Sequence, residues 1–213
     1  GRARLLVVLD VDSTLINEEA IELIADEAGV GERVAAITEL AMAGELDFAA
    51  SLAERVGALA GLSRERLAAA AEHISLTAGA RELVAGVHEA GGVVAVVSGG
   101  FHELLDPIAA ELGLDAHRAN RLEIQDARLT GRTQGPVIDA AAKAIALAEW
   151  TEQFGVPRSR VVAVGDGAND LAMMDAAALS VAFCAKPVVR SRADVSIDRR
   201  DLGAVLPLLG LRG

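Results

Sequence analysis

The sequence has few of the features that mark secreted, membrane-spanning or nucleic-acid-binding proteins. Its 213 residues include one cysteine, so no disulfide can form within the chain, and the reducing cytoplasm is the expected location. No apolar stretch approaches the roughly 18 residues of a membrane-spanning helix, so we expect no membrane partner. Twenty Lys and Arg stand against 31 Asp and Glu, and this net charge of −11 argues against nucleic acid as the main partner.

Aromatic side chains are also scarce. They make up 2% of the sequence, with no tyrosine, whereas hydrophobic residues make up 52%. We therefore expect a large core built from Ala, Leu, Val and Ile. The length suits one α/β domain, or one domain that carries an inserted module.

Three short apolar runs predict buried parallel strands at Leu5–Leu9, Val93–Val97 and Val161–Val164. They are rich in valine and do not alternate with polar residues, which is typical of strands covered on both faces. Further strands are expected at Leu179–Cys184 and Ala193–Ile197, and helices at Ala80–Ala90, Glu103–Leu112, Ala140–Phe154 and Asp170–Ala177. This alternation predicts an α/β fold with a doubly wound, Rossmann-like parallel sheet.

Two segments depart from the alternation. Between Ile16 and Thr77 no strand is evident, and apolar residues recur at helical spacing between glycines. We expect an α/β core of residues 1–15 and 78–213, with residues 16–77 inserted as a helical cap. The segment Leu122–Gly131 has two short extended pieces around a polar turn and predicts a hairpin.

Small and polar residues follow each of the three strongest strands. They are Asp10 and Asp12 after the first, Ser98, Gly99 and Gly100 after the second, and Asp166, Asn169 and Asp170 after the third. Ligands of open α/β sheets bind beyond the carboxyl ends of the strands. We therefore expect all of these residues at one mouth of the sheet.

A cluster of carboxylates at such a mouth needs something to neutralise it, because adjacent buried carboxylates repel one another. A hard cation such as Mg²⁺ is one solution, and a proton held by one of the carboxyl groups is another. Glycine-rich turns free backbone N–H groups to bind an anion. Carboxylates, a cation and an anion cradle together indicate phosphoryl transfer, in which a carboxylate can act as the nucleophile.

Four motifs carry a family resemblance. The stretch "DVDSTL" resembles the first motif of the haloacid dehalogenase superfamily, "VVSGG" the second, Lys143 in "AAKAIAL" the third, and "GDGANDLAMM" the fourth. They occur in the family's order, and the first, second and fourth lie at the ends of predicted strands. The longer stretches "SGGF", "VAVGDGANDLAM" and "VAFCAKP" are similar to the phosphoserine phosphatase family within it, over nearly the whole chain.

The resemblance implies roles for individual residues. Asp10 would be the nucleophile, and Asp12 would be the general acid and then the general base. A Mg²⁺ ion would be bound by Asp10, by the backbone carbonyl of Asp12 and by Asp166, with Asp170 acting through water. Ser98, the backbone N–H of Gly99 and Lys143 would bind the phosphoryl group, and Asn169 would contact the phosphate or the rest of the substrate.

The resemblance also places a substrate pocket in the insert, at Glu19, Met42, Phe48 and Arg55. These residue types suit phosphoserine, which carries an ammonium and a carboxylate besides its phosphate. Glu19 would hold the ammonium, and the guanidinium of Arg55 would grip the carboxylate. Met42 and Phe48 would exclude water, which strengthens both charge contacts.

The expected activity is Mg²⁺-dependent hydrolysis of O-phospho-L-serine, the last step of serine biosynthesis, by a monomer or homodimer. A phosphotransferase with the same aspartyl-phosphate, or a phosphatase of another small phosphomonoester, is the enzymatic alternative. The non-enzymatic alternative is a receiver-like phospho-acceptor or a binding module. Receivers lack an inserted cap and an acid two residues after the phosphorylated aspartate, so the sequence favours an enzyme.

Overall fold

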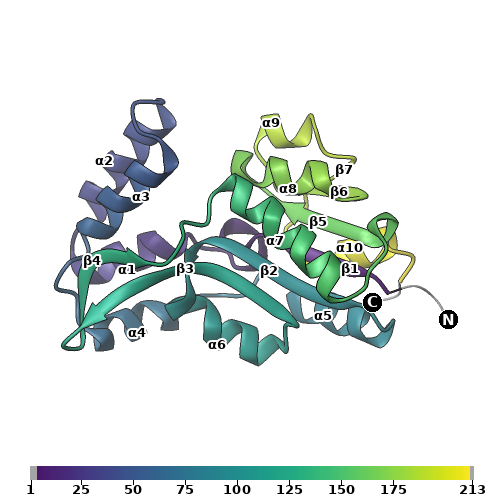
Figure 1. The fold of residues 1–213 in the computed structure, drawn as a ribbon, viewed down its shortest axis with the longest axis horizontal. Coiled ribbons are helices and arrows are strands. Elements are labelled where there is room, and N and C mark those ends of the chain that lie inside the picture. Colours follow the sequence, from purple (N-terminus) through teal and green to yellow (C-terminus); the bar gives the residue numbers. More distant parts are fainter. Residues whose placement is uncertain (1–3, 212–213) are drawn as a thin grey trace.

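In a computed structural model, which describes residues 4–211, the chain forms one sheet of seven strands with helices on both faces (Figure 1). The strand order is β4-β3-β2-β1-β5-β6-β7, and every neighbouring pair is parallel except β3 and β4. The strands are β1 (Leu6–Leu9), β2 (Val93–Phe101), β3 (Ala116–Gln125), β4 (Arg128–Gln134), β5 (Val161–Gly165), β6 (Leu179–Phe183) and β7 (Val195–Ile197). The predicted doubly wound sheet is confirmed.

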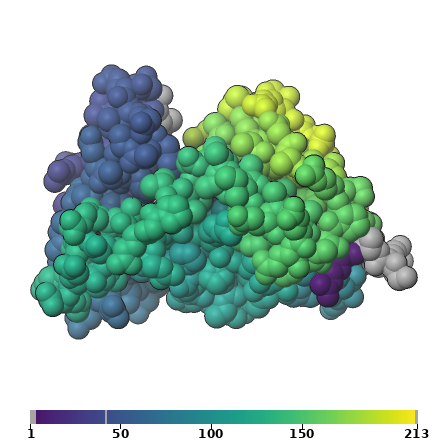
Figure 2. All heavy atoms as spheres, in the orientation of Figure 1, coloured from purple at the N-terminus to yellow at the C-terminus, as the bar shows by residue number. Residues whose placement is uncertain are grey.

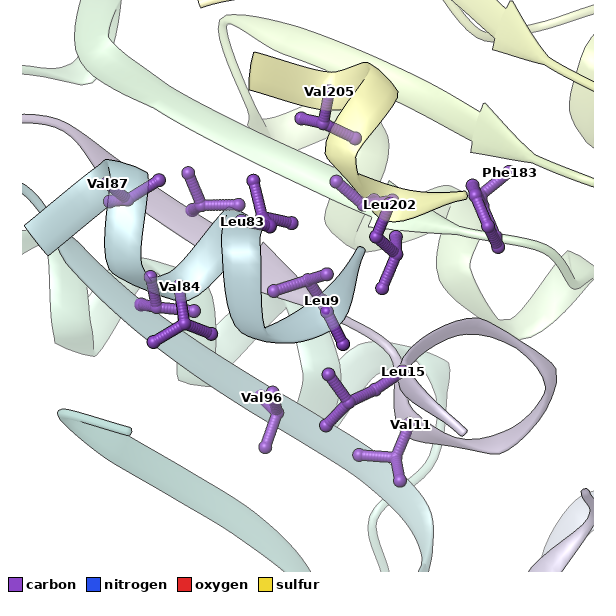
Figure 3. Packing of buried hydrophobic residues seen from close by; sticks show 14 of the residues in the cluster. Leu9, Val11, Leu15, Leu83, Val84, Val87, Val96, Phe183, Leu202 and Val205 are labelled. Atoms are coloured by element: carbon purple, nitrogen blue, oxygen red, sulfur yellow. The ribbon is translucent and has the colours of Figure 1, made fainter. Parts of the chain in front are cut away.

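Strand β1 lies at the centre of the sheet and is buried on both faces, which explains its unbroken apolar sequence. The helices around the sheet are α5 (Ala80–Glu89), α6 (His102–Leu112), α7 (Ala140–Gln153), α8 (Leu171–Ala176), α9 (Pro187–Arg190) and α10 (Val205–Leu208). Val7 and Leu9 face a cluster that includes Leu83 of α5 and Val205 of α10 (Figure 3). Leu6 and Val8 face the opposite cluster, which α7, α8 and α9 cover. The central strand is thereby held rigidly from both sides.

Four helices lie between β1 and α5, in the segment expected to be helical. They are α1 (Ala20–Ala28), α2 (Gly31–Met42), α3 (Phe48–Gly57) and α4 (Arg64–Glu72). Asp47 caps α3 by accepting a 2.7 Å hydrogen bond from the Ala50 N–H, and Ser63 caps α4 in the same way. The four helices share a third hydrophobic cluster, which also includes Phe101 at the end of β2, Leu104 of α6, and Leu122 and Leu129 of the β3–β4 hairpin.

The chain leaves the sheet for these helices and returns to it at one place. Ile16 and Leu76 form an antiparallel bridge, and the Asn17 N–H donates to the Ser75 carbonyl at 3.0 Å. The Thr77 N–H donates to the Leu15 carbonyl at 2.9 Å. The two connections therefore run side by side.

The second strand is longer than predicted. The prediction ended it at Val97, but β2 continues to Phe101, with a shift of register between those two residues. A side chain at either glycine of the extension would be crowded: a Cβ atom at Gly100 would lie 3.0 Å from Ser98 Oγ, and one at Gly99 would lie 3.3 Å from the Phe48 ring. The two glycines therefore let an extended backbone pass close to its neighbours.

The predicted hairpin is present, but its first strand begins six residues earlier, at Ala116. That earlier part pairs in parallel with β2, with Ala95 opposite Ala116. The residues Ala116–Arg118 are half-buried. A half-buried segment needs no continuous apolar run, and this is why the pattern used for the central strands does not identify it.

Among the described residues, no helix combines the length and the apolar character needed to cross a membrane.

Candidate active site

A buried ammonium links two of the predicted site carboxylates. The Nζ atom of Lys143 lies 2.8 Å from Asp10 Oδ1 and 2.8 Å from Asp170 Oδ1, and the lysine is fully buried. Burial alone would lower the pKa of Lys143, but the two carboxylates outweigh it and raise that pKa above its usual value. Lys143 is therefore held charged, at the base of the site.

Three carboxylates crowd the same point. Asp10, Asp166 and Asp170 each place an oxygen within 4.8 Å of the others. Burial, followed by the charge of Asp170, raises the pKa of both Asp10 and Asp166. Such a set of oxygen donors suits a hard divalent cation, which would relieve their mutual repulsion. The fit is best at Asp10 and Asp166, since both line a cavity.

Asp170 is engaged by donors of the protein itself. Its Oδ1 accepts from Lys143, and its Oδ2 accepts from the N–H groups of Asp166 and Gly167 at 3.0 and 3.1 Å. A Cβ atom at position 165 would lie 2.5 Å from the Asp170 carboxyl carbon, so only glycine fits there. This carboxylate therefore fixes Lys143 and the loop after β5.

The hydroxyls of Ser13 and Thr14, which follow Asp12, each donate a hydrogen bond to another acidic side chain. The turn Val11–Leu15 contains Ser13 in a left-handed conformation, with φ 57°, and the Ser13 hydroxyl donates to Glu19 Oε1 at 2.6 Å. The Thr14 hydroxyl donates to Asp166 Oδ1 at 2.9 Å. One short turn thus carries Asp12 and also orients two acids from other parts of the chain.

Asp12 is half-buried, and its Oδ1 accepts from the Ala20 N–H at the start of α1 at 3.2 Å. Burial, and then the charge of Glu19, raise the pKa of Asp12 to about 7. A carboxyl group with such a pKa exchanges a proton readily near neutral pH. It therefore has the property required of a general acid and base.

A cavity of about 400 Å³ opens above these groups. The predicted site residues that line it are Asp10, Asp12, Glu19, Phe48, Arg55, Gly99, Asp166 and Asn169. Figure 2 shows the molecule hollowed between the α2–α3 helices and the part that carries α8 and α9, and the lining residues come from both sides. Glu19 and Arg55 face the same space as Asp10.

Three predicted residues do not line the cavity. Ser98, Lys143 and Asp170 are buried, and the Ser98 hydroxyl accepts a 2.8 Å hydrogen bond from the Gly100 N–H. Met42 is the last residue of α2, and its side chain lies outside the described part of the structure.

The sequence prediction did not include three polar residues of the cavity wall. Thr38 lies on α2, and its hydroxyl donates to the Val34 carbonyl at 3.0 Å. Lys186 is exposed at its rim, and its backbone N–H donates to the Asp166 carbonyl at 3.1 Å. Ser51 is buried in the wall, and its hydroxyl has no hydrogen-bond partner among the described residues. Ser51 precedes Arg55 by one helical turn, a spacing that could have identified it.

A family model for haloacid dehalogenase-like hydrolases matches residues 7–175, and the chain belongs to this family. Several of its curated relatives are phosphoserine phosphatases. The SerB2 enzyme of Mycobacterium tuberculosis is 50% identical over 210 residues, which cover 99% of this chain and 51% of that protein. The enzyme of Streptococcus thermophilus is 47% identical over 204 residues, which cover 96% of this chain and 95% of that one.

The chain thus spans about half the length of the Mycobacterium tuberculosis relative and nearly all of the Streptococcus thermophilus one. A solved phospho-aspartyl intermediate analogue of phosphoserine phosphatase superposes with a TM-score of 0.92 at 44% identity, covering 98% of this chain and 100% of that one. A substrate-bound phosphoserine phosphatase complex also superposes with a TM-score of 0.92, at 43% identity and the same coverage. The resemblance to the phosphoserine phosphatases is confirmed.

Proposed function

We propose that the chain hydrolyses O-phospho-L-serine to L-serine and phosphate through an aspartyl-phosphate, as the last step of serine biosynthesis. The observation that carries the proposal is that one cavity contains Asp10 and Asp12 together with Glu19 and Arg55. The first pair suits a phosphate ester, and the second pair suits an ammonium and a carboxylate. The names of the relatives and of the two solved structures support the same substrate.

In the proposed reaction, Asp10 attacks phosphorus and the seryl oxygen leaves with a proton from Asp12. Asp12 then takes a proton from the water that hydrolyses the aspartyl-phosphate. Lys143 offsets the charge of Asp10, to which it is bonded. Ser98, the Gly99 N–H and Asn169 bind phosphoryl oxygens, and Phe48 and Met42 exclude water from the pocket.

We propose Mg²⁺ as the cofactor, with Asp10, Asp166 and the backbone carbonyl of Asp12 as ligands and Asp170 acting through water. The bonds that Asp170 makes to Lys143 and to two backbone N–H groups support an indirect role for it. When bound, the cation would neutralise charge on the phosphoryl oxygens.

We also propose that residues 16–77 form a cap on a core made of residues 1–15 and 78–213. The paired connections at Asn17 and Ser75 support this division, and so does the hydrophobic cluster through which α1–α4 pack together and against the core residues Phe101, Leu104, Leu122 and Leu129. A cytoplasmic location and a monomeric or homodimeric state belong to the same proposal.

Phosphate release from a small set of esters tests the substrate. We expect the highest kcat/KM for phosphoserine, with phosphothreonine next, and much lower values for phosphoethanolamine, which lacks the carboxylate. Equal rates for phosphoserine and phosphoethanolamine would contradict the assigned substrate. Homoserine, added as an acceptor, reports phosphoryl transfer, and transfer faster than hydrolysis would identify a phosphotransferase.

A further inference from the structure

One buried amide side chain connects two parts of the site without lining the cavity described above. Asn120 of β3 is 1% exposed. Its Nδ2 donates to the Gly99 carbonyl at 2.8 Å, and its Oδ1 accepts from the Ile138 N–H at 2.9 Å. A buried side chain that satisfies a backbone group at each end holds both segments in place, because breaking either bond leaves a buried polar group unpaired.

The first of these bonds fixes a peptide group beside the cavity. The Gly99 carbonyl and the Gly100 N–H belong to one peptide, and in a trans peptide they point in opposite directions. Asn120 binds the carbonyl, and the Ser98 hydroxyl accepts from the N–H at 2.8 Å. A peptide between two glycines rotates easily unless it is held. Here it is held from both sides, and the Ser98 oxygen is oriented with it.

The second bond fixes the start of the helix that carries Lys143. Ile138 directly precedes Asp139, which caps α7 by accepting from the Ala142 N–H at 2.8 Å. Lys143 lies in the first turn of that helix, and its Nζ binds Asp10. Asn120 thus spans from the end of β2 to the base of α7.

We propose that Asn120 is a positioning residue that aligns the Gly99–Gly100 peptide and Ser98 with Lys143 for phosphoryl transfer. This inference rests on the function proposed above. It does not require Asn120 to touch the substrate, because the side chain acts through the two backbone segments that it binds.

Asn120→Ala removes both bonds, and Asn120→Asp keeps an acceptor for Ile138 but turns an oxygen toward the Gly99 carbonyl. In both variants we expect kcat for phosphoserine to fall roughly ten- to a hundredfold, the range that small misplacements produce. Ser180→Ala is the control, since it removes part-buried hydrogen bonds with Asp194 near the sheet edge opposite to β3. It should lower the melting temperature and leave kcat unchanged. A kcat within twofold of wild type in both Asn120 variants would overturn the proposal.

Two further measurements separate alignment from a loss of stability. In a double-mutant cycle, Asn120→Ala should cost much less in the Ser98→Ala background than in wild type, and fully independent effects would overturn the proposal. Hydrogen exchange of the Gly100 amide should accelerate in Asn120→Ala while that of Val7 in β1 is unchanged. Equal acceleration at both amides would assign Asn120 a general structural role. If wild type releases no phosphate from any ester, the proposed function fails, and exchange at Gly100 still tests the contact itself.

Discussion

Thr14 and Asp166 are 152 positions apart in the chain, yet the Thr14 hydroxyl donates a 2.9 Å hydrogen bond to the Asp166 carboxylate. Thr14 is fully buried, and a third residue fixes it, because the Thr77 hydroxyl donates to its backbone carbonyl. The turn after β1 thereby orients an acid that follows β5. Loss of a group that orients a metal ligand in this way typically weakens metal binding or activity by about ten- to a hundredfold.

The first prediction follows from this contact. Thr14→Val keeps the shape of the side chain but removes the donor to Asp166. We expect the Mg²⁺ concentration for half-maximal phosphate release to rise roughly tenfold or more. EDTA should abolish phosphate release by wild type and by Thr14→Val, and added Mg²⁺ should restore it. Thr151→Val, which removes a buried hydroxyl bonded to Leu147 within α7, is the control. Activity that persists in chelator would contradict the metal assignment.

Replacement of the proposed nucleophile should abolish turnover. Asp10→Asn retains the size of the side chain but cannot form the aspartyl-phosphate, so we expect kcat to fall by about a thousandfold or more. Phosphate release is the measurement, with Asp126→Asn at the exposed hairpin turn as the matched control. Substantial turnover by Asp10→Asn would assign the attack to another group.

Arg55 should determine recognition of the substrate carboxylate. Arg55→Ala should raise KM for phosphoserine roughly tenfold to a hundredfold, as expected for the loss of a charge-assisted hydrogen bond, and change KM for an aryl phosphate little. Arg55→Lys keeps the positive charge but lacks the two-pronged geometry, so its KM for phosphoserine should lie between those of wild type and Arg55→Ala. Equal effects on both substrates would exclude the carboxylate role.

The raised pKa of Asp12 predicts a dependence of stability on pH in the metal-free protein. In the unfolded chain this carboxyl loses its proton near its usual pKa of 3.8, whereas in the folded protein it keeps the proton until about pH 7. Between these values the folded state binds more protons, so this group's contribution to stability falls as the pH rises. Asp12→Asn has no proton to lose at this position, so its stability does not show this decrease with rising pH. In EDTA, its melting temperature relative to wild type should increase from pH 4 to pH 7, and a constant difference would refute the assignment.

The hydroxyl of Ser51 has no hydrogen-bond partner among the described residues, so its removal should not destabilise the protein as most substitutions of buried residues do. Since it has no partner among the described residues, Ser51→Ala removes a desolvated polar group and breaks no bond. The melting temperature of the ligand-free protein should stay level or rise. Ser98→Ala, which breaks the bond to the Gly100 N–H, should lower it. A drop of several degrees for Ser51→Ala would reveal a partner of this hydroxyl.

The sequence predicts the parts of this structure that have a local pattern. Unbroken apolar runs identify β1 and β5, and the polar residues directly after them identify the mouth of the sheet. The early part of β3 escapes prediction because it is half-buried beside β2 and has no apolar run. The extension of β2 escapes because Gly99 and Gly100 contribute no side chains to the pattern.

Contacts between distant residues have no such pattern. Asp10 and Lys143 are 133 positions apart, and only their motifs connected them before the structure showed the 2.8 Å bond. The bonds of Asn120 to Gly99 and Ile138 belong to no motif that the sequence prediction used. They depend on the register of β3 beside β2, where Asn120 is opposite Phe101.

The paired connections at Asn17 and Ser75 have a consequence for how substrate range can change. The chain enters the four-helix segment at Asn17 and leaves it at Ser75, and these two residues are hydrogen-bonded to each other. The two ends of the segment therefore lie side by side. Exchanging it would replace the wall that carries Phe48 and Arg55 and leave Asp10, Lys143 and Asp166 where they are. A graft from a relative, cut at these two residues, would exchange the cavity wall at Phe48 and Arg55, and with it Glu19 and the Ala20 N–H, the two groups through which the segment acts on Asp12.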